Sequence, residues 1–141
     1  MTDIRANNRI LLAFVAAFIL NKVFLRPYVI SNDITGLIET FAFSFPNLCE
    51  AVVGTLMLTN IALVLNSHFL ANSQRFKERT IYFTVTTFSA VYVILQEFKV
   101  HNIGGRNVYD SNDVVFSVVG LGLVIGYLLI KKPKYTVENV E

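Results

Sequence analysis

Four stretches of the chain are almost free of charged residues, and short polar segments separate them. Residues 51–74, 80–96 and 114–130 contain no Asp, Glu, Lys or Arg, and residues 10–25 contain only Lys22. A helix crosses the roughly 30 Å hydrocarbon core of a bilayer with about 20 apolar residues. A lysine near the end of such a helix can extend its ammonium to the interface. The pattern therefore predicts four transmembrane helices, at about residues 10–25, 46–66, 80–97 and 113–130.

A different pattern lies between the first two spans. Apolar residues recur at helical spacing over residues 34–45, with polar residues between them. Ser31, Asn32 and Asp33 precede this segment and are candidate N-caps. Pro46 suits the first turn of the following span, where its missing N–H costs nothing. We expect a separate amphipathic helix over this segment, lying in the membrane interface.

Composition supports an all-α, polytopic membrane bundle that forms one domain over residues 1–141. The chain is 54% hydrophobic and 16% charged, with a mean hydropathy of +0.55, whereas soluble domains carry about 25% charged residues. Cys49 is the sole cysteine, which excludes an intrachain disulfide. The basic residues are scattered, so we expect no nucleic-acid partner.

The distribution of lysine and arginine predicts the topology. With four spans, both termini and the second connection share one side, which holds eight of the 12 basic residues: Arg5, Arg9, Arg75, Lys77, Arg79, Lys131, Lys132 and Lys134. The other side holds Lys22, Arg26, Lys99 and Arg106. Short loops rich in Lys and Arg stay in the cytoplasm. We therefore expect a multi-pass protein with both termini cytoplasmic.

Charged residues, a glutamine and glycines cluster where the third span ends and the fourth begins. They are Gln96, Glu97, Gly105, Arg106, Asp110, Asp113 and Gly120. In this segment the chain resembles the VanZ-like family of bacterial membrane proteins, named for a teicoplanin-resistance protein, although Ser117 stands where that family usually has Asn. The resemblance implies a protein of the bacterial inner membrane that influences sensitivity to envelope-acting antibiotics. It implies no particular chemical activity.

The cluster formed by Glu97, Arg106, Asp110 and Asp113 has several interpretations. Arg106 could bind a phosphate of a lipid-linked or cell-wall-related ligand through its planar guanidinium. The three carboxylates could instead hold Mg²⁺ or Ca²⁺, with His101 nearby in sequence. The structural alternative is that the two aspartates cap the fourth helix and that Arg106 pairs with Glu97.

Glu50 is an acid at one end of the longest apolar stretch. An ionisable group inside a span often marks a proton relay or a counter-ion for a substrate, and Lys22, Arg26 and Arg106 are its candidate partners. This feature raises a second hypothesis, a small proton-coupled transporter that uses Glu50. The alternative is that Glu50 reaches interfacial water and favours the helix start.

Other polar and small residues predict helix packing. Asn60 is expected to hydrogen-bond between helices, and Gly122 and Gly126 have the spacing that lets a neighbouring helix approach, within the chain or from a second copy. The sequence contains no catalytic triad order, phosphate-binding glycine loop or metal-binding spacing of Cys and His. It therefore assigns no catalytic residue, metal or cofactor. Membrane lipids are the expected partners, and a third hypothesis is a structural subunit of a membrane complex or homo-oligomer.

Overall fold

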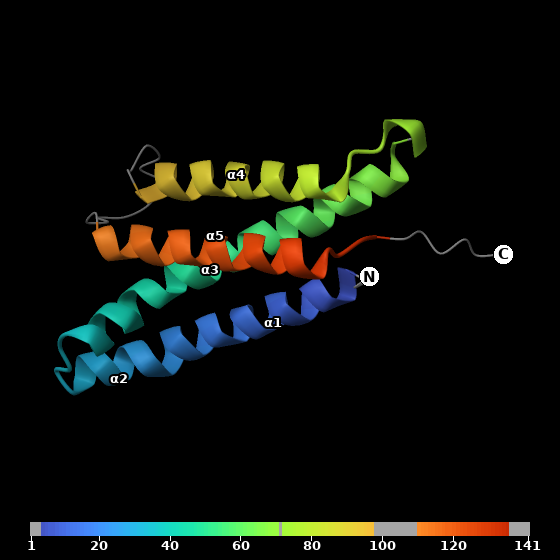
Figure 1. The fold of residues 1–141 in the computed structure, drawn as a ribbon. Coiled ribbons are helices and arrows are strands. Elements are labelled where there is room, and N and C mark those ends of the chain that lie inside the picture. The colour runs from blue at the N-terminus through green and yellow to red at the C-terminus, as the bar shows by residue number, and fades with distance from the viewer. Residues whose placement is uncertain (1–3, 71, 98–109, 136–141) are drawn as a thin grey trace.

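The computed structural model describes residues 4–70, 72–97 and 110–135, which form helices joined by short connections (Figure 1). The first helical stretch is α1 (Ile4–Leu20), continued by the π-helical turn η1 (Asn21–Leu25) and α2 (Arg26–Ser31). The long helices that follow are α3 (Leu37–His68), α4 (Glu78–Glu97) and α5 (Ser111–Lys131), with a 3-10 turn η2 (Asn72–Gln74) before α4. The prediction of an all-α chain is confirmed.

Helix α3 is the centre of the bundle. It crosses diagonally between α1 on one side and the pair α4 and α5 on the other, and it contacts all three (Figure 1). The start of α1, the connection between α3 and α4, and the end of α5 lie at one end of the bundle. The start of α3, the end of α4 and the start of α5 lie at the opposite end. Helix α3 therefore packs against each of the other long helices, and α4 and α5 also pack against each other.

Three of the described helices are long and apolar enough to cross a membrane: Ile4–Ser31, Leu37–His68 and Ser111–Lys131. These helices indicate a membrane protein. Helix α4 does not join them, because it begins with Glu78 and Arg79 and carries several threonines. Three of the four predicted spans thus correspond to apolar helices of sufficient length, and the first two helices are longer than predicted.

The segment expected as a separate amphipathic helix is instead the beginning of α3, which runs unbroken through Pro46. Its 32 residues amount to about 48 Å. Pro46 removes one backbone hydrogen bond, but the residue is buried, together with Ala42 and Cys49 on the same side of the helix. Packing along that face compensates for the missing bond, so the predicted break at the proline is wrong.

The residues predicted to cap the start of this segment instead form hydrogen bonds at the end of α2. Ser31 Oγ and Asn32 Nδ2 donate to the Tyr28 carbonyl, at 3.1 and 2.8 Å, and so satisfy the end of α2. Helix α3 begins after Gly36, whose φ of 83° favours glycine, and no side chain caps it.

The hydrophobic core lies where α3, α4 and α5 meet, around Leu56, Tyr82 and Leu128. Helices α3 and α5 approach closely at Gly120, where an added Cβ would lie 2.7 Å from the Leu48 carbonyl oxygen. An added Cβ at Gly122 or Gly126 would meet no atom within 4 Å. The expected role of these two glycines in close packing within the chain is therefore wrong, since Gly120 has that role.

A hydrogen-bonded network of asparagines joins α1, α3 and α5 at the opposite end of the core from Gly120. Asn7 Nδ2 donates to Asn60 Oδ1 at 2.7 Å, and Asn60 Nδ2 donates to Asn8 Oδ1 at 2.8 Å. Tyr127 Oη donates to Asn7 Oδ1 at 3.0 Å. Asn7 is fully buried. The prediction that Asn60 hydrogen-bonds between helices is confirmed, and we call these four side chains the asparagine network.

Candidate functional site

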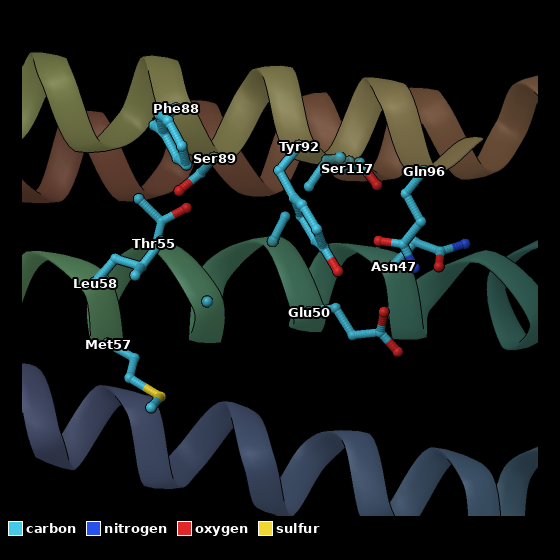
Figure 2. Close-up of a pocket in the computed structure, with 13 residues that line it drawn as sticks. Asn47, Glu50, Thr55, Met57, Leu58, Phe88, Ser89, Tyr92, Gln96 and Ser117 are labelled. Atoms are coloured by element: carbon cyan, nitrogen blue, oxygen red, sulfur yellow. The ribbon is translucent and has the colours of Figure 1, made fainter. Parts of the chain in front are cut away.

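A cavity of about 340 Å³ lies between α3, α4 and α5 (Figure 2). Its polar lining comes from all three helices: Asn47, Glu50 and Thr55 from α3, Ser89, Tyr92 and Gln96 from α4, and Ser117 from α5. Its apolar lining includes Leu58 and Phe88. Binding cavities commonly combine apolar walls with a few convergent polar groups, so we treat this Glu50 cavity as the candidate site.

The lining of the Glu50 cavity changes along the helix axes. Asn47, Glu50 and Gln96 lie toward the end where α3 begins and α4 ends, while Leu58 and Phe88 lie toward the middle of the bundle (Figure 2). From residue 47 to residue 58 a helix rises by roughly 16 Å. The cavity is thus charged and polar at one end and mostly apolar at the other, where the Thr55 and Ser89 hydroxyls lie beside Leu58 and Phe88 (Figure 2). This lining suits an elongated amphipathic molecule.

Two hydroxyl groups in the wall lack hydrogen-bond partners. Thr55 and Ser89 are 0% and 5% exposed, and neither Oγ atom has a partner among the described residues. An unsatisfied buried polar group costs about 1–3 kcal/mol. A ligand that hydrogen-bonds to these hydroxyls would recover part of that free energy, so the cavity is better suited to a molecule with polar groups than to a pure hydrocarbon.

Glu50 borders a second cavity as well. This space of about 220 Å³ lies between α1 and α3 and is lined by Val15, Phe18, Cys49 and Val53 in addition to Glu50. The carboxylate therefore stands at the boundary of two cavities on either side of α3. Among the described residues, Lys22 and Asp113 are charged groups near enough to influence it electrostatically.

The predicted cationic partners of Glu50 have different surroundings. The Lys22 ammonium lies 4.8 Å from the ring centroid of Phe18, on the wall of the second cavity. The Arg26 guanidinium lies 4.6 Å from the ring centroid of Phe43. Lys22 is thus the described cation placed to influence Glu50, Arg26 stacks on an aromatic ring, and Arg106 lies outside the described residues.

The predicted cluster of acids and arginine is described only in part. Asp110 is the N-cap of α5, since its Oδ1 accepts a 2.9 Å hydrogen bond from the Asn112 N–H, and Asp113 follows in the first turn. This geometry confirms the capping interpretation for Asp110. Glu97 is the last residue of α4, while Arg106 and His101 lie outside the described residues. The ligand-binding interpretation of this cluster stays a prediction.

Across residues 4–70, 72–97 and 110–135, no group of three or more His, Cys, Asp and Glu side chains is placed to hold a metal ion. Cys49 is buried against the second cavity. The lining of the Glu50 cavity therefore offers a ligand hydrogen bonds, aromatic surface and the carboxylate of Glu50.

Most polar residues of the Glu50 cavity were not predicted from the sequence. A signal was nevertheless present, because Asn47 and Glu50 are three residues apart on α3, and Ser89, Tyr92 and Gln96 follow at spacings of three and four on α4. Residues at these spacings share one face of a helix. A search for polar residues that share one face of an otherwise apolar helix would have located the Glu50 cavity.

Comparison of the chain with family models, with curated proteins and with solved structures finds no match. The class of protein thus follows from the fold alone: an all-α chain with three helices able to span a bilayer.

Proposed function

We propose that this chain is an integral membrane protein that binds an amphipathic ligand in the Glu50 cavity. The single observation that carries the proposal is the polarity of that cavity, with Glu50, Asn47 and Gln96 at one end and an apolar wall at the other. Molecules embedded in a leaflet have the same polarity along the membrane normal. The ligand would lie parallel to the helices, with its head group near Glu50.

The lining indicates what the head group contains. A carboxylate attracts amines and hydroxyl or amide donors, and hydrogen bonds to charged groups contribute about 1.5–3 kcal/mol. The ring of Tyr92 offers a surface for a sugar or a cation. The unpaired hydroxyls of Thr55 and Ser89 lie further along the cavity, beside Leu58 and Phe88, where they would bond to a polar group next to the tail. A lipid-linked or cell-wall-related molecule with amino or hydroxyl groups combines these features with an apolar tail.

The cellular context of the proposal rests on the sequence. We propose a VanZ-like protein of the bacterial inner membrane, with four spans and both termini in the cytoplasm. The Glu50 end of the bundle would then face the outer leaflet, where lipid-linked precursors of the cell wall are exposed. Deletion of the protein is expected to change sensitivity to envelope-acting antibiotics, and unchanged sensitivity across a broad panel would contradict this part.

Binding is tested by purifying the protein from membranes in mild detergent and measuring retained lipids by native mass spectrometry. We expect a retained amphipathic species, with affinity weakened about 10- to 100-fold in Glu50→Gln because a charge-assisted hydrogen bond is lost. Glu39→Gln is the matched control, since Glu39 is an exposed acid on the same helix that does not line the cavity. Equal retention by wild type and Glu50→Gln would contradict the proposal.

One observation favours a second candidate function, proton-coupled transport. Glu50 lines cavities on both flanks of α3, and a carboxylate shared by two cavities can bind a proton in one and a substrate in the other. Reconstituted protein would then show flux of cationic substrates driven by a proton gradient. This flux would be abolished in Glu50→Gln and retained in Glu39→Gln. A protein that binds its ligand but shows no flux would support binding alone.

A further inference from the structure

A second apolar site lies at the opposite end of the bundle, where α3 passes into α4 (Figure 1). A groove of about 600 Å³ is lined by Ala62, Leu65, Phe69, Phe76, Ile81 and Val85. The Phe69 and Phe76 side chains are 79% and 62% exposed, so two aromatic rings border an open groove. This α3–α4 groove does not share a residue with the Glu50 cavity.

The connection that forms the groove is held by side-chain hydrogen bonds. Asn66 donates to the Phe76 carbonyl at 3.1 Å and accepts from the Phe76 N–H at 2.9 Å. Arg75 donates to the carbonyls of Ser67 and Leu70, at 2.6 and 3.3 Å, at the end of α3. Leu70 and Asn66 also line the groove. The Arg75 guanidinium is therefore fixed beside the groove, and two of its five N–H donors are engaged in these bonds.

The charges around this connection are unbalanced. Lys77 and Arg79 flank Phe76 and Thr80, which line the groove. Glu78, the acid between these two cations, is paired with Lys134, whose Nζ lies 2.9 Å from Glu78 Oε1. Because its charge is compensated by Lys134, Glu78 does not offset Arg75, Lys77 and Arg79. Arg75, whose bond to the Leu70 carbonyl places it at the groove, and Lys77, which follows the lining residue Phe76, form a positively charged rim at this edge of the apolar groove.

We propose that the α3–α4 groove binds an anionic phospholipid, with an acyl chain against Phe69, Phe76 and Val85 and the phosphate beside Arg75 and Lys77. The groove alone does not select its occupant, since in a bilayer any acyl chain can fill it. The cationic rim does, because arginine forms paired hydrogen bonds with phosphate oxygens and lysine adds a point charge. Charge complementarity thus favours an anionic head group over a zwitterionic one.

The test uses the full-length protein in neutral detergent, titrated separately with phosphatidylglycerol and phosphatidylcholine and monitored by native mass spectrometry. We expect preferential retention of phosphatidylglycerol. Lys77→Gln should reduce this preference about fivefold, as expected for one basic residue near an anionic surface. Arg9→Gln, an equal loss of charge on α1 at the same end of the bundle, is the matched control and should not change it.

A third variant tests the groove rather than the charge. Thr84 is exposed and lines the groove, so Thr84→Phe fills space without altering the rim and should reduce retention of both lipids. Equal retention of the two lipids by the wild type would overturn the proposal. So would an equal loss in Arg9→Gln, which would mean general surface attraction, or full displacement by a short fatty acid, which would mean adventitious binding of any anionic detergent-like molecule.

Discussion

The asparagine network and the Glu50 cavity are both polar regions inside an apolar bundle, yet they differ in how their polar groups are satisfied. In the network, Asn7 and Asn60 bond to each other, and Tyr127 and Asn8 complete the set. In the cavity, the hydroxyls of Thr55 and Ser89 have no partner among the described residues. Completed hydrogen bonds hold helices together, whereas incomplete ones beside a cavity are available to a ligand. The comparison separates a structural polar region from a binding one.

The sharpest way to break this comparison is the same substitution in both regions. Asn7→Leu removes two hydrogen bonds and leaves Asn60 and Tyr127 without their partner, so we expect the free energy of unfolding to fall by about 1–3 kcal/mol. Asn47→Leu, in the cavity, is expected to change it by less than about 0.5 kcal/mol. Reversible unfolding by denaturing detergent in mixed micelles measures both. Equal losses would mean that the cavity wall is as structural as the network.

A smaller effect is expected when only a hydroxyl is removed. Tyr127→Phe deletes one bond to Asn7 and should cost about 0.6–1.7 kcal/mol. Thr55→Val deletes an unpaired buried hydroxyl at nearly constant volume, so stability should stay the same or rise by up to about 1 kcal/mol. The same unfolding assay compares the two variants. A clear loss in Thr55→Val would show that this hydroxyl has a partner and would weaken the case for the cavity.

The smallest expected effect concerns the ion pair between Lys134 and Glu78, a partly exposed contact outside both polar regions. Its contribution to stability is the one against which the two buried regions are compared. The hydrogen bond from Lys134 lowers the pKa of Glu78 below its ordinary value. A carboxyl whose pKa is lowered on folding stabilises the protein above its unfolded-state pKa, about 4.3, and this contribution is lost as pH falls through the folded-state pKa. Since the pair is partly exposed, we expect less than about 1 kcal/mol.

Thermal unfolding of the wild type and of Lys134→Gln at pH 7 and pH 3 measures this contribution. The two proteins should differ at pH 7, and the difference should shrink toward pH 3 as Glu78 becomes protonated. A difference that persists unchanged at pH 3 would mean that Lys134 acts through something other than its pairing with Glu78.

Sequence reasoning succeeded where the determining interactions are local. The cap at Asp110 depends on a backbone N–H two residues away, and a deep polar residue such as Asn60 must find a partner inside a bundle. It did not identify that partner, because Asn7 lies 53 residues away and is brought there by helix packing. The continuation of α3 through Pro46 likewise depends on burial of the proline ring against other helices.

The Glu50 cavity required information that a linear pattern does not contain. Polar residues at helical spacing define the face of each helix, but the rotation of α3, α4 and α5 about their axes decides whether those faces converge. In this bundle Gly120 allows α5 to approach the α3 backbone at Leu48. Helix packing also places Tyr92 of α4 in the same cavity wall as Glu50, which the α3 segment alone does not predict.

The length of α3 has a consequence for how the protein experiences its surroundings. A rod of about 48 Å exceeds the roughly 30 Å thickness of bilayer hydrocarbon, and such a mismatch is accommodated by leaning, by protrusion or by local thickening of the lipid. Helix α3 borders the Glu50 cavity, the second cavity next to α1 and the α3–α4 groove. Any change in the tilt of α3 therefore alters all three volumes together. Thin and thick bilayers should therefore present differently shaped sites from one and the same polypeptide.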